Sequence, residues 1–194
     1  MVLQPKTRIG MPLDEFIHDA SAEPFEWLDG RRIPLIPRMA GQSVVISELL
    51  AAGFQYHDSH PVAGDFWPSP TYVLLDDAGL VVHALEPDIA FYAAARWEAY
   101  LANMPDWQGK PFVFVPDLCV EVVSKNDLFD EVQRKAALYL DDGVREVWVV
   151  SPEDRSVFVY VAGSKVIARL TAEDALTSPL LPEFSLAVNA LFPA

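Results

Sequence analysis

Three residues whose side chains bind metal ions or activate water are the first candidates for chemistry in this chain: Asp88, Glu121 and Lys135. Glu121 lies in the apolar run Leu118–Val123, where an ionised carboxylate is costly unless a cation compensates it. Carboxylates are the hard oxygen ligands that Mg²⁺ or Mn²⁺ prefers, and a lysine beside them can orient or activate a water molecule. Such a set could hydrolyse a phosphodiester bond, because a bound metal would stabilise the charge that develops on the phosphate.

The run Leu118–Val123 predicts a central β-strand, since its residues are β-branched or aliphatic and turn-forming residues flank it on both sides. Glu121 is therefore near the carboxyl end of a strand, where ligand and catalytic sites collect in open α/β sheets. The next element is predicted to be a helix from about Asp127 to Asp141. Lys135 falls on its inward face, so a helix folded back over the sheet would present the ammonium group to Glu121. Asp88, which heads an earlier strand, could supply the second carboxylate.

The remaining pattern indicates an α/β (mixed α+β) fold: a mixed central sheet flanked by helices, with an N-terminal hairpin and helix, in one domain over residues 1–194. Hairpins are predicted at Phe25–Ile36, turning at Asp29-Gly30, and at Thr71–Leu85. Helices are predicted to begin at Pro12 and to cover Ser43–Ala52, which Gly53 would end. Further strands are predicted from Pro87 and at Glu146–Val150, Val157–Val161 and Lys165–Leu170. The stretch Asp58–Pro70 is predicted to be a loop, and Ala93–Pro111 to be irregular or partly helical.

Composition narrows the class of protein. A chain of 194 residues with 52% hydrophobic residues can bury one well-packed core. The formal net charge of −14 argues against a broad basic surface of the kind that binds nucleic acid without specificity. Two local basic groups remain possible, one formed by Arg31, Arg32 and Arg38 and one by Lys125, Arg134 and Lys135.

The location expected from the sequence is the cytoplasm. No window approaches about 18 uninterrupted apolar residues, so no membrane partner is expected. The first residues lack the basic and apolar segments of a signal peptide. Cys119 is the only cysteine and cannot form an internal disulfide, which suits a reducing compartment and a packing role.

Each candidate residue also has a purely structural interpretation. Glu121 could belong to a buried ion pair, Lys135 could pack its stem on the core while its head reaches water, and Asp88 could be a turn residue. His57 and His60 suggest a metal cluster, but they border a predicted loop, where surface histidines are commoner. The sequence contains neither a Gly-rich phosphate loop nor a G-x-S-x-G nucleophile elbow.

Motifs spread over nearly the whole chain carry a family resemblance. They are Phe25–Gly30, Pro87–Ile89, Pro116–Ser124, Lys135 with Tyr139, Gly143–Val150 and Leu176–Pro182. In order and spacing they resemble the Uma-two family of restriction endonuclease-like proteins, within the PD-(D/E)XK nuclease superfamily. The resemblance implies a restriction-endonuclease-like core, a Mg²⁺ or Mn²⁺ ion held by Asp88 and Glu121, and a catalytic lysine.

The chain departs from the superfamily signature in two places. The signature lysine stands two residues after the glutamate, where this chain has Val123, so the resemblance implies that Lys135 on the following helix takes this role. Family members often have a histidine before the helix that follows the first hairpin, where this chain has Met39–Ser43. Glu26 resembles the additional acidic residue that many of these nucleases bring from an N-terminal element.

The expected function is therefore a metal-dependent endonuclease that acts on DNA as a homodimer, with Asp88, Glu121, Lys135 and Glu26 as catalytic residues. The alternative is a catalytically silent nuclease fold that binds or regulates, in which Glu121 and Lys135 form a structural ion pair. The acidic net charge favours this alternative. A small-molecule hydrolase that uses the same carboxylates is a third interpretation.

Overall fold

The computed structural model describes residues 9–124, 127 and 129–192. Contacts within the chain divide it into two compact units, each assembled from three separate stretches. The first unit comprises Met1–Pro37, Thr71–Glu86 and Asp106–Val115, and the second comprises Arg38–Pro70, Pro87–Pro105 and Pro116–Ala194. The prediction of a single domain over residues 1–194 stays a prediction.

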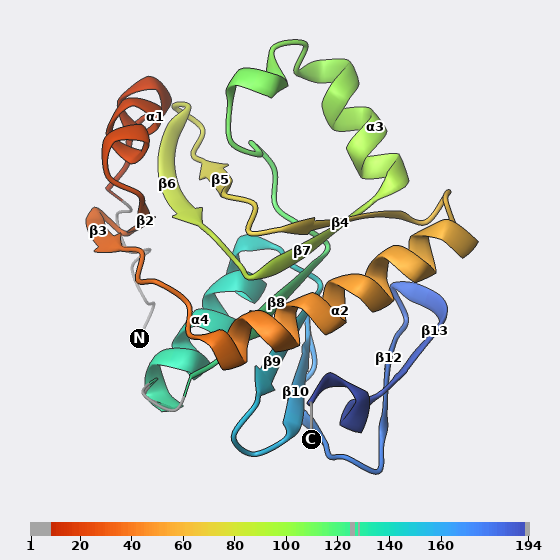
Figure 1. Ribbon diagram of the computed structural model, residues 1–194. Helices are drawn as coiled ribbons and strands as arrows, with labels where there is room; N and C mark the ends of the chain where they lie inside the picture. Colours follow the sequence, from red (N-terminus) through yellow and green to blue (C-terminus); the bar gives the residue numbers. More distant parts are fainter. Residues whose placement is uncertain (1–8, 125–126, 128, 193–194) are drawn as a thin grey trace. The chain divides into compact units, whose positions relative to one another are not determined.

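The first unit contains a five-stranded antiparallel sheet and helix α1 (Figure 1). Its elements are β1 (Met11–Pro12), α1 (Leu13–Ala22), β2 (Phe25–Leu28), β3 (Arg31–Pro34), β5 (Tyr72–Leu75), β6 (Leu80–Leu85) and the 3₁₀ helix η1 (Trp107–Gly109). The predicted hairpins β2–β3 and β5–β6 are confirmed. Asp29 and Gly30 both have positive φ, the conformation that a tight two-residue hairpin turn requires.

The second unit is built on a six-stranded sheet in the order β11-β10-β9-β8-β7-β4 (Figure 1). Its strands are β4 (Gly64–Pro68), β7 (Ile89–Ala93), β8 (Leu118–Val122), β9 (Glu146–Ser151), β10 (Ser156–Val161) and β11 (Ala168–Leu170). β8 and β9 run parallel, and the other neighbouring pairs run antiparallel. The predicted mixed central sheet is thereby confirmed, with β8 among its inner strands.

Helices cover this sheet. α2 (Ala40–Ser59) contacts β4 and β8, α3 (Ala94–Asn103) contacts β4 and β7, and α4 (Phe129–Asp142) contacts β9. Because side chains alternate along a strand, Leu118, Val120 and Val122 join the same core as the buried face of α2. Glu121 points the other way, toward α4. The alternation along β8 therefore places Glu121 on the side of α4, opposite the side that packs against α2.

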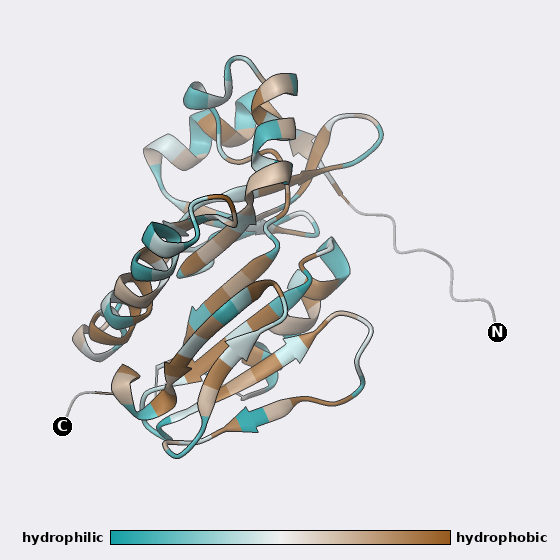
Figure 2. Cartoon of the chain, turned by 90° about the vertical axis from the view of Figure 1, so that its right-hand side faces the viewer, coloured by the Kyte–Doolittle hydropathy of each residue, from teal (hydrophilic) through white to brown (hydrophobic). Residues whose placement is uncertain are grey.

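A second hairpin closes the core on the α2 side. It consists of β12 (Ala175–Ser178) and β13 (Leu181–Ala187) and is followed by the 3₁₀ helix η2 (Val188–Leu191). Its side chains Leu176, Leu181 and Phe184 belong to the core cluster. Figure 2 shows that the strands are predominantly hydrophobic, as expected for a sheet covered by other elements. Within the described residues, no helix is both long and apolar enough to cross a membrane.

Two local predictions were wrong, and a third left two interpretations open. α2 does not end at Gly53 but continues to Ser59, and Gly53 lies where a Cβ atom would come within 2.9 Å of the Phe66 ring. This glycine therefore permits close helix–sheet packing instead of ending the helix. The stretch Asp58–Pro70, predicted to be a loop, contains strand β4. The stretch Ala93–Pro111 contains α3 and η1 and is thus partly helical, as one of its two interpretations had it.

Candidate active site

Asp88 directly precedes β7, and Glu121 lies near the end of β8. The antiparallel register pairs Ile89 with Val120, so its continuation by one residue places Asp88 opposite Glu121 along the two chains. Asp88 is buried, and its Oδ2 accepts a hydrogen bond from the backbone N–H of Val122 at 2.7 Å. The fold therefore brings the two predicted residues to neighbouring positions along the chain.

Lys135 makes the contact that the helical pattern predicted. Its Nζ lies 2.9 Å from Oε1 of Glu121, and the two side chains are 29% and 17% exposed. The same carboxylate oxygen accepts a hydrogen bond from the hydroxyl group of buried Tyr139, one helical turn further along α4. The predicted pairing of Glu121 with Lys135 is thus confirmed, whereas the catalytic role of the pair stays a prediction.

Two polar residues near the start of α2 complete this arrangement. Arg38 Nε lies 2.5 Å from Oδ1 of Asp88. Gln42 Nε2 donates to the backbone carbonyl of Val122 at 2.7 Å, and its Oε1 accepts from the backbone N–H of Met39 at 2.9 Å. The sequence pattern indicated Arg38 only as part of a basic group, and Gln42 only as part of the stretch where family members often have a histidine. Arg31 and Arg32 of that group belong to the first unit, and Lys125 of the other group lies outside the described residues.

Glu26, the fourth predicted site residue, lies on β2 in the first unit. Its side chain is buried, and Oε1 accepts a hydrogen bond from the backbone N–H of Glu86 at 3.0 Å. Glu26 thus holds the end of β6 within its own unit. Asp88, Glu121 and Lys135 all belong to the second unit, where Lys135 contacts Glu121 directly, and the role of each of the four residues stays a prediction.

The donor set at Asp88 and Glu121 fits a hard divalent cation. Mg²⁺ is typically bound through one or two carboxylates, with water and substrate phosphates as the remaining ligands. Zinc sites instead use three or four protein ligands, mostly His and Cys. Within the described residues, no cluster of three or more His, Cys, Asp or Glu side chains could hold a metal ion. That Asp88 and Glu121 hold Mg²⁺ or Mn²⁺ stays a prediction.

The weaker candidates, His57 and His60, have structural partners. Nδ1 of His57 lies 3.0 Å from the carbonyl oxygen of Gly64 and 3.3 Å from Oδ1 of Asp65. His60 stacks on Tyr56 with ring centroids 4.4 Å apart, and its Nε2 lies 3.3 Å from Oε2 of Glu183. Both histidines lie in the last turns of α2 or just beyond it, where these contacts fasten the helix end to β4 and β13.

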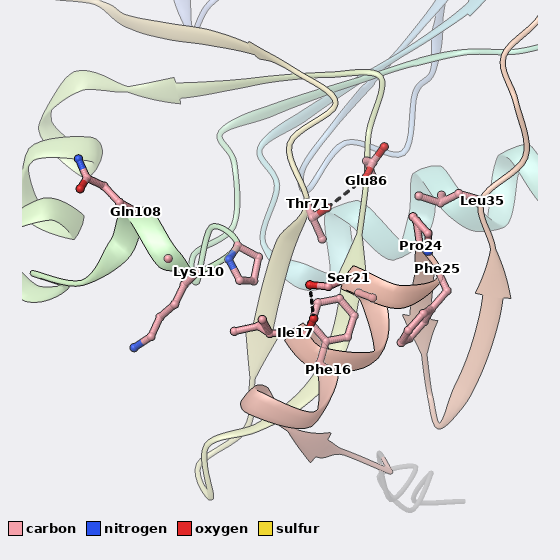
Figure 3. Close-up of a pocket in the computed structure, with 13 residues that line it drawn as sticks. Phe16, Ile17, Ser21, Pro24, Phe25, Leu35, Thr71, Glu86, Gln108 and Lys110 are labelled. Atoms are coloured by element: carbon pink, nitrogen blue, oxygen red, sulfur yellow. Dashed lines mark hydrogen bonds between the residues drawn. The ribbon is translucent and has the colours of Figure 1, made fainter.

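The first unit contains a cavity of about 440 Å³ (Figure 3). Its lining mixes apolar and polar side chains and comes mainly from α1, from the start of β2 and from the segment around η1, with Leu35, Thr71 and Glu86. Glu86, one of its charged residues, accepts a hydrogen bond from the hydroxyl of Thr71 at 3.1 Å. None of the four predicted site residues lines this cavity.

Burial perturbs two ionisable groups on β8 and β9. It raises the pKa of the Cys119 thiol, with the charge of Glu121 as a smaller contribution, so the thiol stays protonated and suits the predicted packing role. Burial also raises the pKa of Glu146, while hydrogen bonds from Trp148 Nε1 at 2.6 Å and Ser178 Oγ at 2.7 Å oppose the rise. Glu146 thereby ties β9 to the β12–β13 hairpin.

Comparison with known proteins identifies both the fold and the family. A crystal structure titled as "a putative nuclease belonging to DUF820 from Anabaena variabilis ATCC 29413" matches with a TM-score of 0.74, covering 94% of this chain and 97% of that chain at 20% sequence identity. This likeness shows a shared fold and confirms the predicted fold class. Among curated proteins, none matches the chain. The family model Uma2, described as "Putative restriction endonuclease", matches residues 13–189, and the chain therefore belongs to the Uma2 family, as its motifs predicted.

Proposed function

We propose that this protein is a metal-dependent nuclease that hydrolyses phosphodiester bonds in DNA. The observation that carries the proposal is the ion pair of Lys135 with Glu121, together with the register of β7 and β8, whose continuation places Asp88 opposite Glu121. Two carboxylates and a lysine are the groups that this hydrolysis needs. The family description and the fold shared with a structure titled as a nuclease support the same class of reaction.

Each residue has a distinct role in the proposal. Asp88 and Glu121 would hold Mg²⁺ or Mn²⁺, which supplies Lewis acidity toward the phosphate oxygens and toward a water molecule. Lys135, within hydrogen-bonding distance of Glu121, would position the attacking water and stabilise the negative charge that develops on the phosphate. Tyr139 would act through Glu121, because its hydroxyl fixes the orientation of that carboxylate.

Cleavage of supercoiled plasmid DNA in the presence of Mn²⁺ tests the proposal. The wild type should cut the plasmid, whereas Glu121→Gln and Lys135→Met should each lower the rate by at least about 10³-fold. Glu131→Gln is the matched control, because Glu131 is an exposed carboxylate on α4 and its loss should leave cleavage unchanged. Cleavage that persists in Glu121→Gln at the wild-type rate would contradict the assignment and point to a contaminating nuclease.

Calorimetric titration with Mn²⁺ separates metal binding from catalysis. Wild type and Glu131→Gln should bind the ion, and Glu121→Gln should bind it far more weakly because a ligand is lost. Lys135→Met should retain binding while losing cleavage, since the proposal gives the lysine no role as a metal ligand. If every variant binds Mn²⁺ as tightly as the wild type, the ion binds elsewhere.

A catalytically silent binding module is the second candidate. It is favoured by the net charge of −14 and by the fact that Asp88 and Glu121 each already contact a basic side chain. Under this alternative the wild type neither binds Mn²⁺ nor cuts DNA, and its thermal midpoint is the same with and without the ion.

We also propose that the active form is a homodimer, because cutting both strands of a duplex requires two sites. Sedimentation of the protein alone and with a short DNA duplex tests this. A particle that stays monomeric in both conditions while still linearising the plasmid would contradict the dimer.

A further inference from the structure

We propose that Arg38 weakens metal binding in the free protein by bonding Asp88, and that a phosphate of the bound nucleic acid strengthens it by drawing the guanidinium group away. Arg38 would thus be a phosphate-binding residue whose departure frees a metal ligand. This inference rests on the proposed function, because it concerns the same two carboxylates.

The first argument is the occupancy of Asp88. Its Oδ1 lies 2.5 Å from Arg38 Nε, and its Oδ2 accepts the backbone N–H of Val122 at 2.7 Å. The carboxylate is only 8% exposed, so both oxygens are engaged on a side chain with little access to water. Val122 belongs to the ladder of β8 and cannot withdraw without fraying the strand. Oδ1 is therefore the oxygen that can be released, and Arg38 is the group that must release it.

The second argument is the local charge. Asp88 and Glu121 carry two negative charges, and their partners Arg38 and Lys135 carry two positive charges. The formal charge of this group of four is zero, so it offers a divalent cation no net attraction. A cation that reached Oδ1 would also lie next to the guanidinium and be repelled by it. Strong metal binding therefore requires one of the two basic side chains to move.

The third argument is that Arg38 is the more mobile of the two. It precedes α2 in a segment that is neither helix nor strand, and its side chain is 35% exposed. Lys135 is held within α4 and lies 5.9 Å from the centre of the Tyr139 ring, in addition to its contact with Glu121. A movement of Lys135 would also remove the residue proposed to position water. Arg38 lies outside both helix and strand, and we therefore expect it to be the residue that moves.

A phosphate is the group best suited to draw Arg38 away. The guanidinium group is planar and offers several donors that match phosphate oxygens in pairs. A phosphate near Asp88 would also supply oxygen ligands for the cation, which a site of only two carboxylates needs. Metal and nucleic acid would then favour each other's binding, and the coupling would be reciprocal.

Two affinities measured on Arg38→Gln test the proposal without any cleavage assay. Mn²⁺ binding is measured without DNA, from the free-ion electron paramagnetic resonance signal. DNA binding is measured without metal, from the fluorescence anisotropy of a labelled short duplex in EDTA. Arg38→Gln should tighten Mn²⁺ binding by at least about tenfold, because a repelling charge is gone. The same variant should bind DNA several-fold more weakly. The slope of log K against log[salt] should fall by about 1, the value expected for the loss of one phosphate contact.

Arg96→Gln is the matched control. Arg96 pairs at 3.0 Å with the fully buried Asp117, which precedes β8, and Arg145 also contacts that carboxylate. The substitution removes the same charge from a similar pair at the other end of the strand, so Mn²⁺ binding should stay within about twofold of the wild type. An equal gain in Arg96→Gln would overturn the proposal, since the effect would then be one of overall charge.

Arg38→Lys keeps the proposal testable if Arg38→Gln fails to fold. It retains the positive charge beside Asp88 but loses the paired donors, so Mn²⁺ binding should resemble the wild type while DNA binding weakens. Arg38→Lys binding Mn²⁺ ten times more tightly than the wild type would overturn the proposal. So would unchanged or weaker Mn²⁺ binding in a folded Arg38→Gln, because a merely structural arginine would lower both affinities. Absence of Mn²⁺ binding in the wild type and in every variant would overturn the proposed function as well.

Discussion

Replacing Lys135 by methionine should lower the free energy of unfolding by about 1–3 kcal/mol. Nζ of Lys135 and Oε1 of Glu121 are 2.9 Å apart, and the side chains are 29% and 17% exposed. Coulomb's law at an effective dielectric constant of about 20 gives about 6 kcal/mol of attraction at this distance. The cost of removing both charges from water and of ordering two side chains offsets most of it. Exposed pairs retain at most about 1 kcal/mol, and loss of one partner from a buried pair costs about 3–5 kcal/mol, so this half-buried pair should fall between.

Urea unfolding of a double-mutant cycle measures this quantity. The cycle comprises the wild type, Lys135→Met, Glu121→Gln and the double variant. Because glutamine has no charge for the lysine to neutralise, the double variant should be more stable than the sum of the single changes predicts, by about 1–2 kcal/mol. Lys110→Met is the control: Nζ of Lys110 lies 2.7 Å from Oδ2 of the more exposed Asp106, so its loss should change the free energy of unfolding much less than Lys135→Met does.

A stability of Lys135→Met within about 0.5 kcal/mol of the wild type, together with no coupling in the cycle, would refute the reasoning. Such a result would mean that groups other than Lys135 offset the cost of burying the Glu121 carboxylate. The cycle also bears on function when it is repeated with Mn²⁺. A metal bound at Glu121 should stabilise the wild type more than Glu121→Gln, whereas a purely structural ion pair should show no difference.

Two further predictions concern the same unit. Burial raises the pKa of Glu146, so this carboxyl group stabilises the fold below its unfolded pKa, and that contribution is lost as the pH rises through the folded value. Glu146→Gln has no charge to bury, so its free energy of unfolding relative to the wild type should rise as the pH increases above the ordinary glutamate pKa of about 4.3 in urea titrations, and a flat or falling difference would contradict this. Gly53→Ala should lower stability by about 1–3 kcal/mol, because the new Cβ would lie 2.9 Å from the Phe66 ring. Gly41→Ala has open space around it and should stay within about 1 kcal/mol of the wild type in thermal melts, so equal effects of the two substitutions would show that packing against Phe66 is not tight.

The elements that carry Glu121 and Lys135 could be predicted because their signals are local. A short aliphatic run and a helical pattern fix which residues face inward, and the ion pair followed from those two facts. Arg38 and Gln42 could not be found in this way, since their contacts with Asp88 and Val122 join residues 50 and 80 positions apart in the sequence. The residues around an exposed arginine before a helix do not predict which carboxylate it will contact.

The errors at Gly53 and β4 have one physical origin. Glycine lowers helix propensity by about 1 kcal/mol, which predicted a helix end at Gly53. In the fold that cost is offset by close contact with Phe66, which lies on β4 itself. Conversely, the glycine and prolines around β4 predicted a loop, whereas pairing with β7 at the edge of the sheet imposes a strand. The second half of α2 and strand β4 stabilise each other, so the sequence of either segment alone does not predict its structure.

The placement of Lys135 on α4 instead of β8 makes assembly of the site a tertiary event. A carboxylate and a lysine two positions apart on one strand would stay together whenever that strand is formed. Here Asp88 and Glu121 remain neighbours through the register of β7 and β8, but Lys135 joins them only while α4 is docked. Partial opening of the helix would therefore disconnect the lysine at a lower free energy than global unfolding, while the two carboxylates stay in place. The integrity of this site would thus follow the local stability of a single helix, and a ligand or partner that clamps or releases α4 could act on it without touching any of the three residues.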